Sequence, residues 1–303
     1  MSHLKIKGIH YGLTLLYSYL LPVIDVEETS YGFKFKYVVG SAAGLQCVFR
    51  EGILETECTI NSSKHSLVER LLGLDRHALF MELCKLLGLD KCVASSITLM
   101  HEPSYKKYVA YSVYLSRNTD YYINTVQWVR GLISRGAIKS TSYIAREFNN
   151  VKHQVDYVLG RGDEPLREAI GLMSLRGFGV KLAKAYLLHA YGLTEHAPVD
   201  RHYAEFLNVK TASPAKSTCI KFSLRCNVCT RHCPYSYSTR SYGVFNGVLQ
   251  SLVYIYGRLV LGRRSKLEKI LVKDAQYYAD QLEKLLSYSK LLTGRLYKPC
   301  SDR

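Results

Sequence analysis

Apolar residues alternate with polar ones in the first part of the chain, and this pattern predicts strands. Three short runs, 33–39, 44–50 and 53–60, are rich in β-branched and aromatic residues. Glu51 and Gly52 separate the last two runs, as the turn of a β-hairpin would. We therefore predict a small antiparallel sheet near the N-terminus.

The apolar period changes after the strands and predicts helices. From Ser66 onward, leucines recur at intervals of three and four residues, and Gly73 and Gly88 act as stop signals. Further helix-length segments follow, among them 245–259 and an amphipathic segment, 267–292. A sheet that precedes a mostly helical region predicts an α+β fold.

The predicted elements divide the chain into four regions. An antiparallel β-sheet domain occupies 1–65, a helical domain 66–210, a cysteine-rich loop 211–240 and C-terminal helices 241–303. The most apolar N-terminal stretch, 9–24, is interrupted by polar residues and is too short to span a membrane. We interpret it as buried structure in a soluble intracellular protein of the cytoplasm or nucleoid.

The composition of the chain indicates a polyanionic partner and a metal site. Lys and Arg outnumber Asp and Glu by 41 − 25 = 16, which fits nucleic acid, although a basic thermophile protein or a ribosome-associated protein would show the same excess. Nine cysteines are an odd number, and four of them lie between positions 219 and 233. This distribution favours a metal site over a disulfide framework. Four others, Cys47, Cys58, Cys84 and Cys92, are expected to be reduced core thiols.

One stretch carries the candidate chemistry. Gly177 and Gly179 bracket a turn whose backbone can approach a phosphate closely, because neither residue has a Cβ. Val180 and Lys181 follow at the start of a predicted helix, where free backbone N–H groups bind anions. Asp200 lies nineteen residues after Lys181, next to Pro198. Considered singly, a solvated lysine and a helix-capping aspartate would each be the ordinary interpretation.

Together these residues resemble the helix-hairpin-helix and catalytic-aspartate motif of the DNA glycosylase superfamily. The resemblance places the motif at 175–191 and implies a DNA N-glycosylase that also cleaves abasic sites as an AP lyase. In that chemistry Lys181 attacks the anomeric carbon and forms a Schiff base, which requires an uncharged amine favoured by burial and nearby cations. Asp200 stabilises the positive charge that develops on the sugar. His202 is expected to support the helix start.

Other segments resemble the 8-oxoguanine DNA glycosylase family, which has a small sheet domain before its helical domain. The resemblance implies that Gly32 accepts the N7 hydrogen of 8-oxoguanine and that Asn118 fills the gap and reads the opposite cytosine. It also implies that Gln250 reads the flipped base and that Tyr254 stacks on it. Gln250 and Tyr254, four residues apart, share a helix face. The family often has cysteine where this chain has Ala185, so one wall of the base pocket must be built differently.

Four cysteines, Cys219, Cys226, Cys229 and Cys233, could ligate one iron–sulfur cubane or one zinc ion. Their loop resembles the [4Fe-4S] loop of endonuclease III, but its last interval is shorter and it is followed by a long C-terminal region. The resemblance implies a structural [4Fe-4S] cluster that supports DNA binding, with zinc as the alternative.

We therefore expect a monomeric base-excision repair enzyme that removes 8-oxoguanine, with damaged or abasic double-stranded DNA as its partner and no membrane partner. One rival is an endonuclease III-like glycosylase/AP lyase for oxidised pyrimidines. A rival of another class is a noncatalytic helix-hairpin-helix protein that only binds DNA. The pairing of Lys181 with Asp200 argues against the noncatalytic protein, because binding a phosphate at the hairpin requires neither the lysine nor the aspartate.

Overall fold

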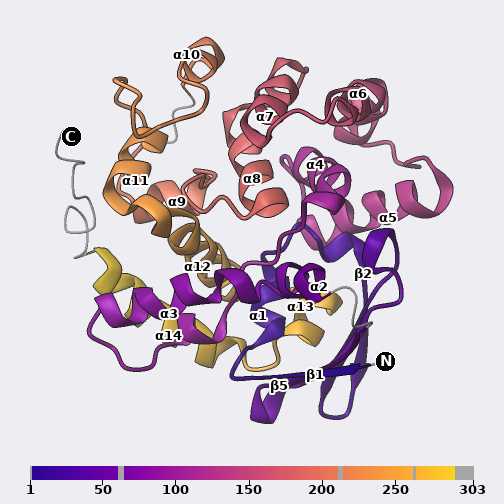
Figure 1. Ribbon diagram of the computed structural model, residues 1–303, viewed down its shortest axis with the longest axis vertical. Coiled ribbons are helices and arrows are strands. Elements are labelled where there is room, and N and C mark those ends of the chain that lie inside the picture. The colour runs from indigo at the N-terminus through magenta and orange to yellow at the C-terminus, as the bar shows by residue number, and fades with distance from the viewer. Residues whose placement is uncertain (1, 61–64, 211–213, 262–263, 291–303) are drawn as a thin grey trace.

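An antiparallel sheet lies at one end of the molecule, and helices form the remainder (Figure 1). The computed structural model describes residues 2–60, 65–210, 214–261 and 264–290. The five strands are ordered β1-β5-β4-β3-β2. Their bounds are β1 (Ser2–Lys7), β2 (Ile24–Thr29), β3 (Gly32–Tyr37), β4 (Gln46–Arg50) and β5 (Glu55–Ile60).

The three predicted strands are confirmed as β3, β4 and β5, and a short 3-10 turn at Glu51–Ile53 joins the last two. Strands β1 and β2 were not predicted. Both lie at the edges of the sheet, where most of their side chains remain at least partly accessible, so their sequences lack a long apolar pattern. Pairing across the sheet, rather than their own residues, defines them as strands.

The apolar stretch at 9–24 is buried, as predicted. It forms α1 (Tyr11–Leu16) and a 3-10 turn (Leu21–Val23), and its polar side chains have partners inside the protein. His10 accepts a hydrogen bond from the backbone of α1, and Thr14 accepts one from the backbone of Thr98. These bonds explain why a buried segment tolerates polar residues.

The helices after the sheet confirm the α+β prediction. Gly73 and Gly88 end helical turns with φ of 71° and 73°, as their predicted role requires. Within the described residues, no helix is long and apolar enough to cross a membrane. The helices up to the cysteine loop are α2 (His65–Leu71), α3 (His77–Leu86), α4 (Lys106–Leu115), α5 (Val126–Arg135), α6 (Tyr143–Gly160), α7 (Pro165–Ser174), α8 (Val180–Tyr191) and α9 (Arg201–Phe206).

The C-terminal region differs in part from the prediction. The helix predicted at 245–259 is confirmed as α12 (Asn246–Leu259), but the single helix predicted at 267–292 is wrong. It is divided into α13 (Lys266–Leu271) and α14 (Ala275–Lys290). Asp274 accepts a hydrogen bond from the backbone of Tyr277, so it caps a new helix where apolar periodicity alone suggested continuity. Residues 291–303 lie outside the described part of the chain.

C-terminal helices pack on N-terminal elements. Helix α13 packs on α1 and on β3, and an added Cβ at Gly12 would lie only 1.7 Å from the Leu271 carbonyl oxygen. Helix α14 packs along α12. The C-terminal helices therefore cover N-terminal elements and connect the sheet to the helical part (Figure 1).

The prediction of reduced core thiols is wrong for four cysteines. Cys47 and Cys58 form a disulfide, as do Cys84 and Cys92. Cys47 and Cys58 face each other on β4 and β5, with their Cα atoms 4.1 Å apart. Strand register brings them together, and their spacing in the sequence does not reveal it.

Candidate active site

A short turn at residues 175–179, the hairpin, joins α7 to α8. Gly177 has φ of +77°, a conformation that favours glycine, and an added Cβ would lie 2.4 Å from Nη1 of Arg117. Arg117 donates a hydrogen bond to the Gly177 carbonyl (3.1 Å) and forms an ion pair with Glu147 (2.6 Å). Gly179 caps α8, whose first residue is Val180. Arg117 therefore holds the hairpin through the Gly177 carbonyl. A Cβ added at Gly179 would meet no atom within 4 Å, so the hairpin is open to solvent at this residue.

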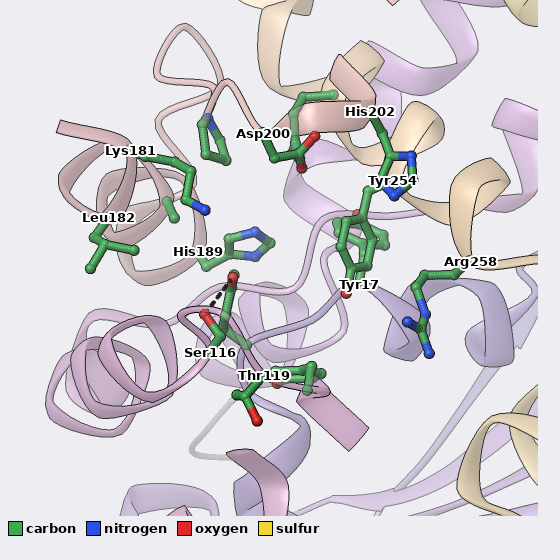
Figure 2. Close-up of a pocket in the computed structure, with 15 residues that line it drawn as sticks. Tyr17, Ser116, Thr119, Lys181, Leu182, His189, Asp200, His202, Tyr254 and Arg258 are labelled. Atoms are coloured by element: carbon green, nitrogen blue, oxygen red, sulfur yellow. Dashed lines mark hydrogen bonds between the residues drawn. The ribbon is translucent and has the colours of Figure 1, made fainter. Parts of the chain in front are cut away.

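Lys181 and Asp200 line one cavity of about 210 Å³, although they come from different helices. Lys181 lies in the first turn of α8, and Asp200 lies at the start of α9. Figure 2 shows the amine and the carboxylate projecting into the same space. Other lining residues are Tyr17, Tyr19, Ser116, Thr119, Tyr121, Leu182, Ala185, His189, Pro198, His202, Gln250, Tyr254 and Arg258.

The two oxygens of Asp200 have different partners. Oδ1 accepts a hydrogen bond from the backbone N–H of Tyr203 (2.8 Å), which makes Asp200 the N-cap of α9. Oδ2 accepts one from Nε2 of Gln250 (3.1 Å). The capping interpretation is therefore correct in structural terms, and it leaves Oδ2 facing the cavity residues. Capping holds the carboxylate in place rather than excluding it from chemistry.

Lys181 is exposed, unlike the helix residues that follow it. The burial expected to favour an uncharged amine is therefore not provided by the protein alone. The cavity also contains the carboxylate of Asp200. Any ligand that fills the cavity would change both the solvation and the surroundings of this lysine.

Helix α12 supplies the opposite wall, with Gln250 and Tyr254 on one face. The Gln250 side chain is buried, while Tyr254 is partly accessible. Close packing brings this helix to the site: Gly247 donates to the Thr194 carbonyl (2.6 Å), and an added Cβ there would lie 2.7 Å from the same oxygen. Burial raises the pKa of the Tyr254 hydroxyl, so the ring is neutral.

Two other predicted residues do not line this cavity. Asn118 follows α4, is exposed, and adopts φ of +47°, which asparagine tolerates. It is the neighbour of Arg117, which binds the hairpin. Gly32 pairs with Arg50 in the sheet, and an added Cβ there would lie 2.2 Å from the Phe49 carbonyl oxygen. Close strand packing therefore accounts for this glycine.

The sequence did not single out several cavity residues. Tyr17 and Tyr19 come from the turn after α1, far from Lys181 in the chain, and no local pattern links them. His189 had a detectable signal, because it follows Lys181 and Ala185 by eight and four residues on the same helix face. Its ring lies close to both tyrosines, with centroids 5.9 Å from Tyr17 and 4.8 Å from Tyr19.

The four clustered cysteines line one small cavity beside α8 and are not joined by disulfides. Cys219 lies in α10 (Lys216–Lys221), and Cys233 caps α11 (Pro234–Tyr242). The buried amine of Lys184 donates to the Leu224 carbonyl (2.7 Å), which ties this loop to α8. In the described ranges, no three His, Cys, Asp or Glu side chains meet as a metal-binding group. The thiol donor set suits iron or zinc, and the identity of a metal stays a prediction.

The fold of this chain is similar to the folds of solved DNA-bound proteins, one of them an 8-oxoguanine glycosylase/lyase. No protein-family model matches the chain, and no curated protein matches it in sequence. One similar solved structure is the Clostridium acetobutylicum 8-oxoguanine glycosylase/lyase with double-stranded DNA containing cytosine opposite 8-oxoguanine. Its TM-score is 0.51 at 10% identity, over 84% of this chain and 93% of that chain. Another is MBOgg1 with a low-affinity DNA ligand, with a TM-score of 0.53 at 13% identity, over 85% and 96%.

Proposed function

We propose that this protein is a base-excision DNA glycosylase with AP lyase activity that removes 8-oxoguanine from duplex DNA. The observation that carries the proposal is the shared cavity of Lys181 and Asp200 directly behind the hairpin. The likeness of the fold to an 8-oxoguanine glycosylase/lyase and to MBOgg1, both solved with DNA, supports it. The net charge of +16 suits a polyanionic partner. DNA as substrate implies an intracellular site of action, and the proposed working unit is a monomer.

Lys181 acts as the nucleophile. A flipped nucleotide fills the cavity, covers the exposed amine and removes water from it, which favours the uncharged form. Nζ then bonds to C1′ as the C1′–N9 bond breaks, and the base leaves with a proton. Opening of the sugar produces a C=N bond to Lys181. Loss of a C2′ proton expels the 3′ phosphate, and water hydrolyses the C=N bond to restore the lysine.

Asp200 stabilises the positive charge at C1′ as the glycosidic bond breaks. Its position supports this role, because the cap of α9 and the hydrogen bond from Gln250 orient the carboxylate before substrate enters. A carboxylate that is already oriented stabilises charge without reorganisation at the moment of reaction.

Base recognition is assigned to α12. Gln250 hydrogen-bonds the flipped base, and Tyr254 stacks on it, which repays the cost of unstacking. The bond from Nε2 of Gln250 to Asp200 leaves the amide oxygen of Gln250 as an acceptor. Gly32 was predicted to recognise the N7 hydrogen, but it does not line the cavity, so this proposal does not depend on it.

The hairpin and the loop after α4 are assigned to DNA binding. The backbone N–H groups of Gly177, Gly179 and Val180 lie at the start of α8, where a phosphate binds favourably. Asn118 fills the gap left by the flipped base. Arg117 connects the two, since it precedes Asn118 and binds the Gly177 carbonyl.

A metal is proposed at Cys219, Cys226, Cys229 and Cys233, with a structural role and no part in bond breaking. A [4Fe-4S] cluster is the first candidate, and zinc is the alternative. Anaerobically purified protein is expected to contain iron and sulfide and to absorb visible light broadly. Colourless protein with one zinc per chain would reject the cluster but keep the site. Protein without either metal would reject both.

The proposal is tested by trapping the Schiff base. Borohydride reduces the C=N bond, so wild-type protein with a duplex containing 8-oxoguanine or an abasic site is expected to form a covalent adduct. Lys181→Gln is expected to form none. The matched control is Lys85→Gln, an equal loss of charge at an exposed position on α3 away from the cavity, which should trap fully.

Three results would redirect the proposal. Trapping by Lys181→Gln equal to that by the wild type would show that another residue is the nucleophile. Faster excision of thymine glycol than of 8-oxoguanine by the wild type would favour the endonuclease III-like function. Tight DNA binding with neither excision nor trapping would favour a noncatalytic role.

A further inference from the structure

His189 is a buried polar side chain inside the proposed base pocket. Only 2% of it is exposed, yet it lines the same cavity as Lys181 and Asp200. It lies two helical turns after Lys181 on α8, with Ala185 between them on the same face. Since Ala185 has only a methyl group, the imidazole is the first side chain on this face, after Lys181, with polar atoms to offer a ligand.

The ring of His189 has no hydrogen-bond partner among the described residues. Nδ1 is enclosed and unbonded, and no hydrogen bond is formed by Nε2 either. Tyr19 packs edge-on against the ring at 75°, so the surroundings are aromatic rather than polar. Buried polar groups in proteins are nearly always paired, and an unpaired one in a cavity indicates a partner that arrives with a ligand.

The neighbouring polar groups of the cavity are already engaged. Gln250 donates to Asp200, and the hydroxyl groups of Tyr19 and Ser116 lie 3.2 Å apart in a hydrogen bond (Figure 2). Tyr17 donates to the Thr98 carbonyl. Each of these neighbours therefore has at least one hydrogen bond, whereas His189 has none among the described residues.

The imidazole is uncharged at neutral pH. Burial, with a smaller contribution from nearby His101, lowers the pKa of His189 from 6.5 to about 3. A neutral imidazole has one proton, on either Nδ1 or Nε2. Placing it on the enclosed Nδ1 would bury an N–H without an acceptor, which proteins rarely tolerate. The proton therefore belongs on Nε2, which then acts as a donor.

We propose that His189 is a base-specificity residue whose Nε2–H donates a hydrogen bond to a carbonyl oxygen of the flipped base. This inference rests on the proposed glycosylase function and adds a residue to its recognition site. It also assigns a polar side chain to the pocket wall opposite α12, where Ala185 supplies only a methyl group. The ligand class is an oxidised purine with a carbonyl group at the deep end of the pocket.

The test measures binding without chemistry, in a Lys181→Gln background. The two probes are duplexes with 8-oxoguanine or with tetrahydrofuran, an abasic analogue that has no base. The ratio of their dissociation constants reports base recognition, while hairpin and phosphate contacts cancel. His189→Phe keeps an aromatic ring but removes both nitrogens, and it is expected to reduce the preference for 8-oxoguanine about tenfold or more.

Two further variants distinguish the nitrogens. The amide nitrogen of glutamine can occupy the place of Nε2, whereas that of asparagine is nearer to Nδ1. His189→Gln is therefore expected to restore most of the preference and His189→Asn to restore little. Because these two variants are compared with each other, the test remains decisive if His189→Phe does not fold.

An unchanged preference in His189→Phe, or equal behaviour of the Gln and Asn variants, would overturn the proposal while leaving the glycosylase function intact. Failure of the function itself is recognised separately, because protein with native Lys181 would then neither trap an abasic site nor excise 8-oxoguanine. That result would remove both proposals.

Discussion

Asp200 combines a structural and a proposed chemical task, one for each carboxylate oxygen. Oδ1 caps α9, and Oδ2 faces the cavity. Asparagine caps helices as well as aspartate does, so Asp200→Asn removes the charge but keeps the cap. Alanine at the same position would remove both, and its loss of activity could not be assigned to either task.

Asp200→Asn is expected to fold normally and bind DNA but to excise 8-oxoguanine about 10²–10³-fold more slowly, because a lost electrostatic contact in the transition state costs about 2.7–4 kcal/mol. Single-turnover excision kinetics measure the change, and urea unfolding measures stability. Asp200→Ala is the comparison, with an additional loss of about 1 kcal/mol in stability. Full activity of Asp200→Asn would exclude the carboxylate from the mechanism.

At the scale of elements, the hairpin between α7 and α8 contains two glycines in different surroundings. Gly177 has positive φ, and its Cβ position is occupied by Arg117 and by the Tyr114 hydroxyl at 2.6 Å. Gly179 has φ of −96° and open space around it. One glycine is therefore required by the fold, while the other leaves a free surface that a phosphate could approach.

Alanine substitutions should separate these two requirements. Gly177→Ala is expected to destabilise the protein by about 1–3 kcal/mol, because alanine is strained at positive φ and meets Arg117. Gly179→Ala is expected to keep full stability but to bind both damaged and undamaged duplexes more weakly, since the new methyl group faces the phosphate. Urea unfolding and fluorescence anisotropy with labelled duplexes measure the two effects. Unchanged DNA affinity in Gly179→Ala would argue against a phosphate at the hairpin.

At the scale of the whole molecule, buried histidines make stability depend on pH. His189 is uncharged in the folded protein, with a pKa of about 3, whereas an unfolded chain protonates it near 6.5. The unfolded state therefore binds more protons between these values. The contribution of His189 to the free energy of unfolding is fully present above about pH 6.5. It is lost progressively as the pH falls toward 3.

Wild-type protein is expected to lose about 2 kcal/mol more of its free energy of unfolding than His189→Phe when the pH falls from 7 to 5. The difference between the two proteins isolates His189, because other titrating groups are common to both. Urea unfolding at the two pH values measures it. Parallel pH profiles would show that the imidazole is not held uncharged, and the donor assignment of Nε2 would then lose its basis.

Some features of this protein follow from the sequence alone, because neighbouring residues encode them. Apolar periods predicted β3, β4, β5 and α12, and glycines marked the ends of helices. The motif from Gly177 to Asp200 predicted the hairpin and placed a lysine and an aspartate within reach of each other, and the structure brings both to one cavity. In such segments, turn chemistry and helix period leave few alternatives.

Other features depended on contacts between distant residues, which only the tertiary structure could decide. Edge strands β1 and β2 exist because partner strands bind them, and register joined Cys47 to Cys58. Close packing between strands accounts for Gly32, while Tyr17 and Tyr19 reach the cavity of Lys181 from the turn after α1. Local sequence specifies what each element can be. Long-range packing determines which side chains share a cavity, since residues that meet there are far apart along the chain.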